Sequence, residues 1–304
     1  MIISINKTFD LRIKFFSSSC ILLICFITFL FDQAQSEEIH INSLKVNFDS
    51  NFKIAGARVI SGYPIEGNLI IAQTEAGNSI NLNNQKINLS EQGMFVIGFD
   101  RDSDINLNLE VISSKGEILT TNILPVQRDY QIEIIQGIKK SMVQPPKDRL
   151  ERIQKEINVV KNVRQIVLPV GDFPLGFDWP IVGRISGLFG SQRILNGIPK
   201  SPHYGIDIAA PKGTLIKAPA SGIVTLVDNL YYSGLTVILN HGLGVNSTFL
   251  HLKSSILEVG DEVDRGELIG TVGSSGRSTG AHLDWRIDWL GKRLDAELLA
   301  GPMP

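Results

Sequence analysis

Cysteine is almost absent from this chain of 304 residues, and both cysteines lie close to its N-terminus. Cys20 and Cys25 fall inside one apolar run, and no cysteine follows them. The chain beyond that run therefore has no disulfide, no thiolate metal site and no cysteine nucleophile. Any hydrolytic chemistry in this part must come from other residue types.

Clusters of basic residues are also scarce. The chain has 29 lysines and arginines against 31 acidic residues, and its basic runs, such as Lys139-Lys140, are short. A nucleic-acid-binding surface needs concentrated positive charge, so we expect no nucleic-acid partner. The composition, 43% hydrophobic and 20% charged, is that of a globular protein, and the length suggests about two domains.

The N-terminal segment has the pattern of a targeting sequence. Lys7, Arg12 and Lys14 precede the apolar run Phe15–Phe31, and Ala34-Gln35-Ser36 offers small residues for cleavage. This predicts a signal peptide over residues 1–36 and export to the periplasm or cell envelope. The alternative is an uncleaved anchor, the one case in which we expect membrane contact. As a helix the run would span roughly 25 Å, short of the ~30 Å hydrocarbon core.

Residues 37–135 have the pattern of a β-sandwich-like domain. Short apolar or alternating runs such as NLIIAQ and MFVIGF are separated by turn signals at Gly77-Asn78, Asp102-Ser103 and Gly116. Several short strands at this spacing are typical of a sandwich. The region has no cluster of titratable residues that would indicate a catalytic site.

Residues 136–178 are predicted to form a helical linker, and residues 179–304 an antiparallel β domain. After Pro145-Pro146 in the linker, apolar residues recur at helical spacing; they are Leu150, Ile153, Ile157, Val160 and Val163. The last part has frequent glycine and short β-branched runs. The expected fold class is thus mainly all-β, and the loops Ser191–Ser201 and Asp228–Gly234 are candidate groove walls.

Four of the five histidines fall in the last domain. His203 and Asp207 would lie ~13 Å apart in an extended strand, and a sharp bend at Gly205 would bring them together. The alternative is a turn with a surface histidine. In NSTFLHL, strand alternation places His251 on the face of Phe249, and His241 is expected to be a turn residue.

The stretch TGAHLDWRIDW aligns polar and apolar residues on opposite faces of a predicted strand. Its apolar face is Leu283, Trp285, Ile287 and Trp289, and its polar face is His282, Asp284, Arg286 and Asp288. His282 and Asp284 would lie ~6.6 Å apart, close enough for both side chains to reach one small site. A solvent-facing row with a salt bridge explains the same pattern, so Arg286 and Asp288 have either role.

These motifs in order, HYGID, TFLHL and STGAHLDW, resemble the LytM or lysostaphin-type zinc metallopeptidases. The resemblance covers Pro180 to about Asp295. It implies a secreted cell-wall hydrolase with a compact antiparallel β core and one Zn²⁺ ion. It also implies that His203 and Asp207 bind zinc and that His251 and His282 are catalytic.

The family's last motif is normally His-x-His, with the second histidine as a zinc ligand. Here that position is Asp284, which strand alternation places on the metal-facing side. A carboxylate binds Zn²⁺ at ~2.0–2.2 Å, so we expect Asp284 to be the third protein ligand. A second carboxylate weakens the Lewis acidity of the ion and relaxes selectivity against Mn²⁺ or Ca²⁺.

Two functions are consistent with this pattern. The first is a zinc-dependent endopeptidase that cleaves peptide crosslinks of peptidoglycan. The alternative, motivated by Asp284, is a weak or inactive LytM-type protein that activates cell-wall amidases at division sites. The metal content of the purified protein distinguishes the two.

Overall fold

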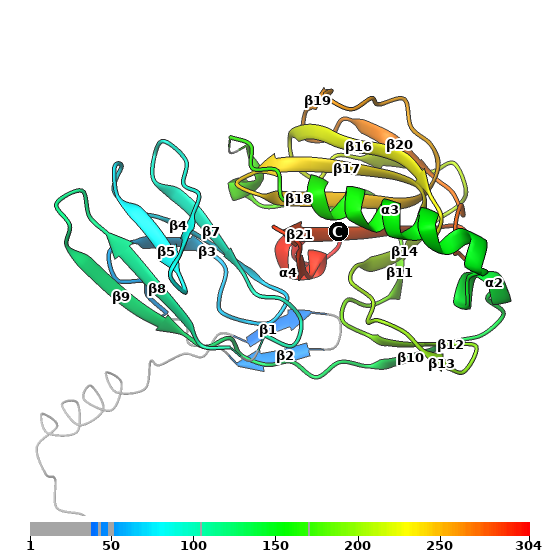
Figure 1. Cartoon of the computed structure of the whole chain (residues 1–304), viewed down its shortest axis with the longest axis horizontal. Helices are drawn as coiled ribbons and strands as arrows, with labels where there is room; N and C mark the ends of the chain where they lie inside the picture. Colours follow the sequence, from blue (N-terminus) through cyan, green and yellow to red (C-terminus); the bar gives the residue numbers. More distant parts are fainter. Residues whose placement is uncertain (1–37, 42–43, 48–51, 104, 170) are drawn as a thin grey trace, which may run out of the picture.

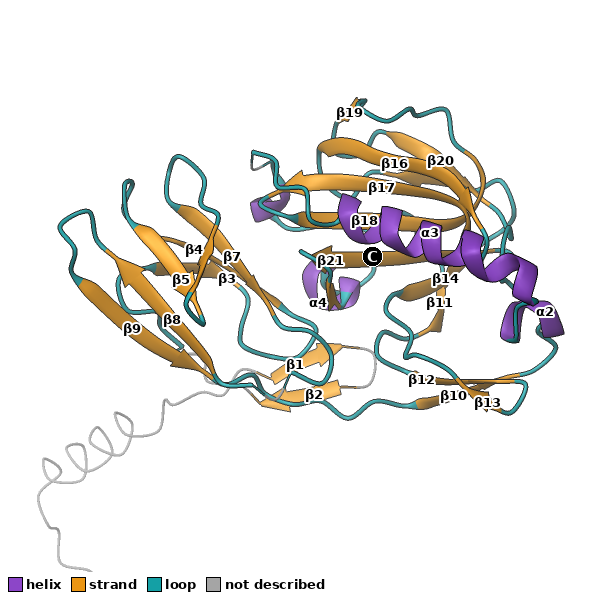
Figure 2. Ribbon diagram, in the orientation of Figure 1, coloured by secondary structure: helices purple, strands orange, loops and turns teal. Residues whose placement is uncertain are grey.

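The computed structural model describes residues 38–41, 44–47, 52–103, 105–169 and 171–304. The predicted signal peptide over residues 1–36 lies outside these ranges. Within them, no helix is long and apolar enough to cross a membrane. Strands dominate, with one long helix lying across the C-terminal sheet, so the mainly all-β fold class is confirmed (Figures 1 and 2).

The N-terminal part contains a hairpin and two antiparallel sheets. The hairpin pairs β1 (Glu38–Ile41) with β2 (Leu44–Asn47). The first sheet has the order β3-β4-β7, with β3 (Arg58–Ser61), β4 (Leu69–Gln73) and β7 (Met94–Gly98). The second has the order β6-β5-β8-β9, with β5 (Ser79–Leu82), β6 (Gln85–Ile87), β8 (Leu107–Ile112) and β9 (Ile118–Ile123). Both sheets contribute to one buried core, for example through Ile70, Ile80, Phe95 and Leu109.

The connecting segment contains a strand and a long helix. It runs through β10 (Ile132–Ile135), α2 (Lys140–Val143), α3 (Lys147–Val163) and the 3-10 turn η1 (Phe173–Leu175). The apolar face predicted for the helix is only partly buried: Val160 and Val163 pack on Leu226, Leu230 and Ile238. Leu150 and Ile157 are half exposed, so the helix buries only part of its apolar stripe.

The C-terminal part is built on a ten-stranded sheet whose main path is β11-β14-β21-β18-β17-β16-β19. These strands are β11 (Arg184–Gly187), β14 (Ile206–Ala209), β16 (Gly222–Leu230), β17 (Gly234–Gly242), β18 (Val245–Ser254), β19 (Glu262–Val263) and β21 (His282–Trp289). The remaining three are β15 (Leu215–Lys217), β20 (Leu268–Val272) and β22 (Lys292–Leu294), and α4 (Ala296–Ala300) follows them. All pairings within this sheet are antiparallel.

The predicted loop Ser191–Ser201 is instead a small hairpin. It pairs β12 (Gln192–Leu195) with β13 (Ile198–Pro199), and β10 adds to β12 in parallel. The segment before the helix is thereby attached to the C-terminal part by main-chain hydrogen bonds. This long-range pairing has no signature in the local sequence.

Strand β21 carries the alternation expected from its sequence. Its even-numbered polar residues face the helix side, and its apolar row, including the fully buried Trp285, packs in the core. Asp288 at the end of the polar row is fully buried and pairs with Arg164 just after α3, with Nε and Oδ2 2.9 Å apart. Burial lowers the pKa of Arg164 to about 9. The row is therefore not a solvent-facing one.

The N-terminal sheets are also firmly attached to the C-terminal sheet. Gly98 on β7 lies against Trp289 and Leu294, where a Cβ would come within 3.1–3.2 Å of both side chains. Arg128 and Asp295 form a buried ion pair 2.8 Å long across the same boundary. Buried apolar residues consequently form one continuous core through both parts.

We expect Asp288→Ala to destabilise the protein strongly, because it leaves the Arg164 guanidinium buried without its carboxylate. Breaking such a pair costs about 3–5 kcal/mol of unfolding free energy, measured by urea denaturation. The matched control is Glu151→Ala, which breaks the exposed pair with Lys155 on α3 and should cost less than about 0.5 kcal/mol. A loss below about 1 kcal/mol for Asp288→Ala would show that the buried pair does not hold the helix in place.

Candidate active site

His203 and Asp207 meet because the chain bends at Gly205. His203 precedes β14, Asp207 lies on it, and their Nε2 and Oδ1 atoms are 3.1 Å apart. Gly205 is required for close approach, since a Cβ there would lie 2.5 Å from Asp284 Oδ1 and from Arg286 Cγ. The bend proposed from the sequence is present. The lack of a side chain at Gly205 lets Asp284 and Arg286 of β21 pack directly against this part of the chain.

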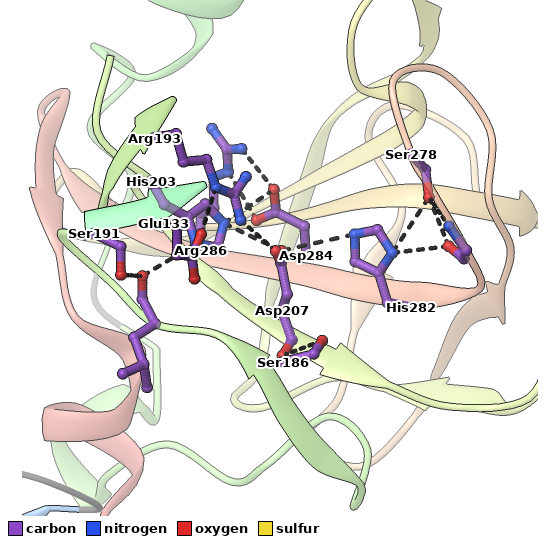
Figure 3. Close-up of polar contacts among 12 residues, drawn as sticks. Glu133, Ser186, Ser191, Arg193, His203, Asp207, Ser278, His282, Asp284 and Arg286 are labelled. Atoms are coloured by element: carbon purple, nitrogen blue, oxygen red, sulfur yellow. Dashed lines mark hydrogen bonds and ion pairs between the residues drawn. The ribbon is translucent and has the colours of Figure 1, made fainter. Parts of the chain in front are cut away.

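Asp284 joins this pair from the neighbouring strand. Asp207 on β14 and Asp284 on β21 are direct partners in the antiparallel register, so both carboxylates project from one face. Asp284 Oδ2 lies 3.5 Å from His203 Nε2. The ligand atoms of His203, Asp207 and Asp284 all lie within 4.8 Å of one another, and their side chains point toward each other in Figure 3.

These three residues fit a metal ion by their chemistry. His203 Nδ1 lies 3.2 Å from the carbonyl of Leu188, which fixes the ring and directs Nε2 toward the two carboxylates. Among the described residues, His203 Nε2 and Asp207 Oδ1 are two of eight buried side-chain atoms that form no well-aligned hydrogen bond, although these two lie 3.1 Å apart. Such orphaned buried atoms are uncommon in proteins and call for an explanation such as an ion. One imidazole and two carboxylates form a donor set that suits Zn²⁺.

Each carboxylate also has an arginine partner: Arg286, which the sequence left as either a salt-bridge partner or a residue of the site, and Arg193, which the sequence did not reveal. Arg286 donates to Asp284 through one edge of its guanidinium, from Nε to Oδ1 at 2.9 Å and from Nη2 to Oδ2 at 2.6 Å. Arg193 on β12 donates to Asp207 Oδ2 and pairs with Glu133 on β10 at 3.0 Å. A carboxylate has about four lone-pair sites, so each of these two carboxylates keeps lone pairs that can bind the same metal ion.

The electrostatics of this cluster favour charged side chains. Burial acts to lower the pKa of His203, but Asp207 and Asp284 outweigh it and raise the pKa to about 9. Burial acts to raise the pKa of Asp207, but His203 and Arg193 lower it to about 2. Arg286 and His203 likewise hold the pKa of Asp284 well below its usual value despite its burial. Both carboxylates are therefore ionised at neutral pH, and His203 carries a proton that it must lose to bind a metal ion.

His251 reaches the site through a β-bulge. Leu235 on β17 pairs with Leu252 on β18, and Val237 pairs with Phe249, so β18 has one extra residue between these two pairs. His251 lies in this bulge and has a left-handed backbone with φ of 63°. The expectation that alternation puts His251 on the face of Phe249 is wrong, because the extra residue in β18 breaks the alternation. Phe249 lies in the core, whereas His251 lines the same cavity as the cluster.

His251 and His282 lie side by side above the cluster, with ring centroids 4.9 Å apart. Both rings are fixed through Nδ1 by the loop between β20 and β21. His251 Nδ1 lies 2.7 Å from the carbonyl of Ser275, and His282 Nδ1 lies 2.9 Å from that of Gly280. His282 Nε2 lies 3.7 Å from Asp207 Oδ1 (Figure 3). Burial lowers the pKa of His251 to about 4, so this ring is neutral at physiological pH.

His241 is a core residue and not the turn residue expected from its sequence. It lies on β17, is almost fully buried, and packs edge-on against Phe177. Its Nδ1 contacts the carbonyl of Ser221 and its Nε2 contacts Ser247 Oγ, each at 2.8 Å. Burial lowers its pKa to about 4. A satisfied histidine of this kind does not contribute to the site.

Two neutral buried histidines predict acid lability of the metal-free protein. His241 and His251 have folded pKa values near 4, below the unfolded value of 6.5, so the unfolded chain binds more protons between these limits. Stability is present above pH 6.5 and is lost as pH falls toward 4. His203, whose folded pKa is raised, contributes little change over this interval.

From pH 6.5 to 4.5 we expect the unfolding free energy to fall by roughly 2 kcal/mol for each of these histidines. Urea titrations of the chelated protein at several pH values measure this slope. His241→Gln should reduce the pH dependence by about half, although it also lowers stability at neutral pH. An unchanged slope in that variant would contradict a neutral His241 in the folded state.

A cavity of about 870 Å³ lies over the cluster and both histidines. The two loops predicted as groove walls do line it, through Arg193 and Lys200 on one side and Tyr232 and Ser233 on the other. Helix α3 and Arg277 complete the wall, and neither was expected from the sequence. The only local signal for Arg277 is that it is the one charged residue in the glycine- and serine-rich stretch GSSGRSTG.

An antiparallel β core that presents one imidazole, two carboxylates and two further histidines in a groove defines a metallopeptidase-type domain. Comparison with known families agrees: residues 201–296 match peptidase family M23, and this part of the chain is an M23 peptidase domain. The LytM/lysostaphin-type resemblance is thereby confirmed.

Curated relatives and solved structures give the same family. The chain is 34% identical over 43% of its length to the peptidoglycan DD-endopeptidase ShyA of Vibrio cholerae, covering 30% of that protein. It is 39% identical over 34% of its length to the DD-carboxypeptidase/endopeptidase Mpg of Neisseria meningitidis, covering 24% of that protein. The chain thus spans less than a third of these relatives. A crystal structure of a Pseudomonas aeruginosa protein assigned to peptidase M23 superposes on 80% of this chain and 97% of that one, with TM-score 0.63 and 25% identity.

Proposed function

We propose that this protein is an exported zinc-dependent endopeptidase that cleaves peptide crosslinks of peptidoglycan in the periplasm or cell envelope. The observation that carries the proposal is the convergence of His203, Asp207 and Asp284 beneath the paired rings of His251 and His282. Relatives named peptidoglycan DD-endopeptidase support the substrate class.

His203, Asp207 and Asp284 are the residues we assign to hold the ion. When bound, zinc supplies Lewis acidity that polarises a scissile carbonyl and makes water more acidic. Arg286 orients Asp284 through its bidentate pair, and the Leu188 carbonyl fixes the ring of His203. Arg193 draws negative charge from Asp207. The site is therefore less electron-rich than two free carboxylates would make it.

We assign proton acceptance to His251. Its Nδ1 proton is engaged by Ser275, so Nε2 carries the free lone pair, and burial keeps the ring neutral. Such a ring takes a proton from the attacking water, as a general base does. His282 is left to stabilise the oxyanion, a role that requires a proton on its Nε2. Because Nδ1 of His282 already donates to the Gly280 carbonyl, the ring donates from Nε2 as well only in its imidazolium form, with Nε2 directed into the groove.

The second candidate is an activator of cell-wall amidases. The observation in its favour is that Asp207 and Asp284 are already paired with Arg193 and Arg286, so the cluster is partly neutralised without an ion. An activator needs the groove but no metal. A purified protein that contains no zinc and retains none after dialysis against it would favour this function.

Digestion of purified sacculi by the exported chain, with and without chelator, tests the proposal directly. We expect mass analysis to show peptide crosslinks converted to separate peptides, with the reaction lost on chelation and restored by added Zn²⁺. Release of crosslinks that is insensitive to chelator would refute zinc dependence. No release by itself, but faster release of glycan-linked peptides by an added amidase, would replace the proposal with the activator function.

A further inference from the structure

The groove contains an arginine that has no acidic partner. Arg277 donates to the carbonyl of Met142 at 3.3 Å, and its guanidinium carbon lies 4.6 Å above the ring of Tyr232. No carboxylate of the described residues forms an ion pair with it, whereas Arg193 has two such partners and Arg286 has one. A guanidinium has five N–H donors, so one long hydrogen bond leaves most of them unused.

The position of Arg277 is fixed with respect to the two histidines. It lies on the loop between β20 and β21, two residues after Ser275, which holds His251, and three residues before Gly280, which holds His282. The Arg277 main chain donates to the carbonyl of Tyr232 at 2.7 Å. Ser275 Oγ further accepts from the Leu235 amide and donates to the Leu252 carbonyl. The loop is thus held in place by its hydrogen bonds to both histidine rings and to Tyr232 in the groove wall.

The electrostatic environment of Arg277 favours an anion. Burial, together with the positive charges of Arg286 and Arg193, lowers the pKa of Arg277, although Tyr232 and Asp284 act in the opposite direction. Tyr232 covers one face of the guanidinium and leaves its edge for hydrogen bonding. A planar edge with paired N–H groups matches a carboxylate in bidentate geometry.

We propose that Arg277 is a specificity-determining residue that binds a free carboxylate of the substrate peptide close to the scissile bond. This inference rests on the proposed function and names the chemistry by which that site selects its substrate. Peptidoglycan stem peptides carry such carboxylates on D-glutamate, on the diamino acid and at the C-terminal D-alanine. A peptide whose relevant carboxylate is amidated offers no negative charge to Arg277.

The test compares wild type, Arg277→Gln and Arg277→Lys on crosslinked stem peptides. The peptides are free, or amidated at one of the three carboxylates. For the free peptide we expect Arg277→Gln to raise KM on the order of tenfold or more with little change in kcat. One amidated peptide should be bound equally by wild type and Arg277→Gln, and it identifies the carboxylate. Lysine should restore part of the affinity, since it keeps the charge but not the bidentate edge.

Arg184→Gln is the matched control, because Arg184 is exposed on β11 and outside the groove. Equilibrium binding of the same peptides to the chelated proteins makes the result independent of turnover. The inference would be overturned if wild type and Arg277→Gln bound the free peptide with equal affinity. It would also be overturned if Arg277→Gln lost the same affinity for every peptide, free or amidated. Arg277-dependent binding without any cleavage would refute the proposed function but not the carboxylate recognition.

Discussion

Replacing Asp284 with alanine is expected to remove the metal from the purified protein. Asp284 supplies the third of three protein donors that lie within 4.8 Å of one another, and two ligands alone rarely hold zinc. The change also leaves Arg286 without its bidentate partner, which adds uncompensated positive charge beside the ion. Inductively coupled plasma mass spectrometry should show zinc stoichiometry falling from about one toward zero, and crosslink cleavage should fall with it.

Asp284→His is the informative companion variant. Imidazole is a good zinc ligand, so we expect it to retain the metal, and the loss of one carboxylate leaves the ion more positive. Asp172→Ala is the matched control, because Asp172 pairs with Arg265 at 2.8 Å outside the groove and its removal should not affect zinc content. Full metal occupancy in Asp284→Ala would show that Asp284 serves only as the ion-pair partner of Arg286.

The sequence predicted β21 well because strand alternation is a local property. A run with period two requires no knowledge of the rest of the fold, so the apolar row and the polar row were both assigned correctly. The structure extends this by adding Arg164, which neutralises Asp288 from the end of a distant helix. Partners of this kind depend on tertiary packing and have no local signature.

The sequence predicted the wrong strand face for His251, because β18 has a bulge at that residue. The bulge depends on how β17 and β18 pair, which the residues around His251 do not specify. Arg193 was missed for a similar reason. Arg193 reaches Asp207 only because β12 forms a hairpin paired with β10, far from the motifs in sequence.

The helix shows a further limit of periodicity. A spacing of three and four indicated one apolar face, yet Leu150 and Ile157 are half exposed, and Ile157 lines the groove beside Arg164. The helix buries only the part of its stripe that contacts the sheet, through Val160 and Val163. Of the two exposed residues, Ile157 lines the cavity and Leu150 does not.

Removing either histidine above the cluster is expected to reduce turnover while the metal remains bound. His251→Ala deletes the neutral ring that we assign as base, and His282→Ala deletes the proposed oxyanion donor. Each change should lower kcat by roughly 10²- to 10⁴-fold, the usual contribution of a positioned acid or base. Zinc stoichiometry should stay near one, since neither ring belongs to the three-residue donor cluster.

His203→Ala separates the two roles, because it should lose zinc and turnover together. His203 Nε2 is the only imidazole donor in the described cluster of three residues. The rings of His251 and His282 are 4.9 Å apart, so loss of one can let water or the other ring substitute in part. The double variant should therefore be less active than either single variant, and loss of zinc from a single variant would identify that histidine as a ligand.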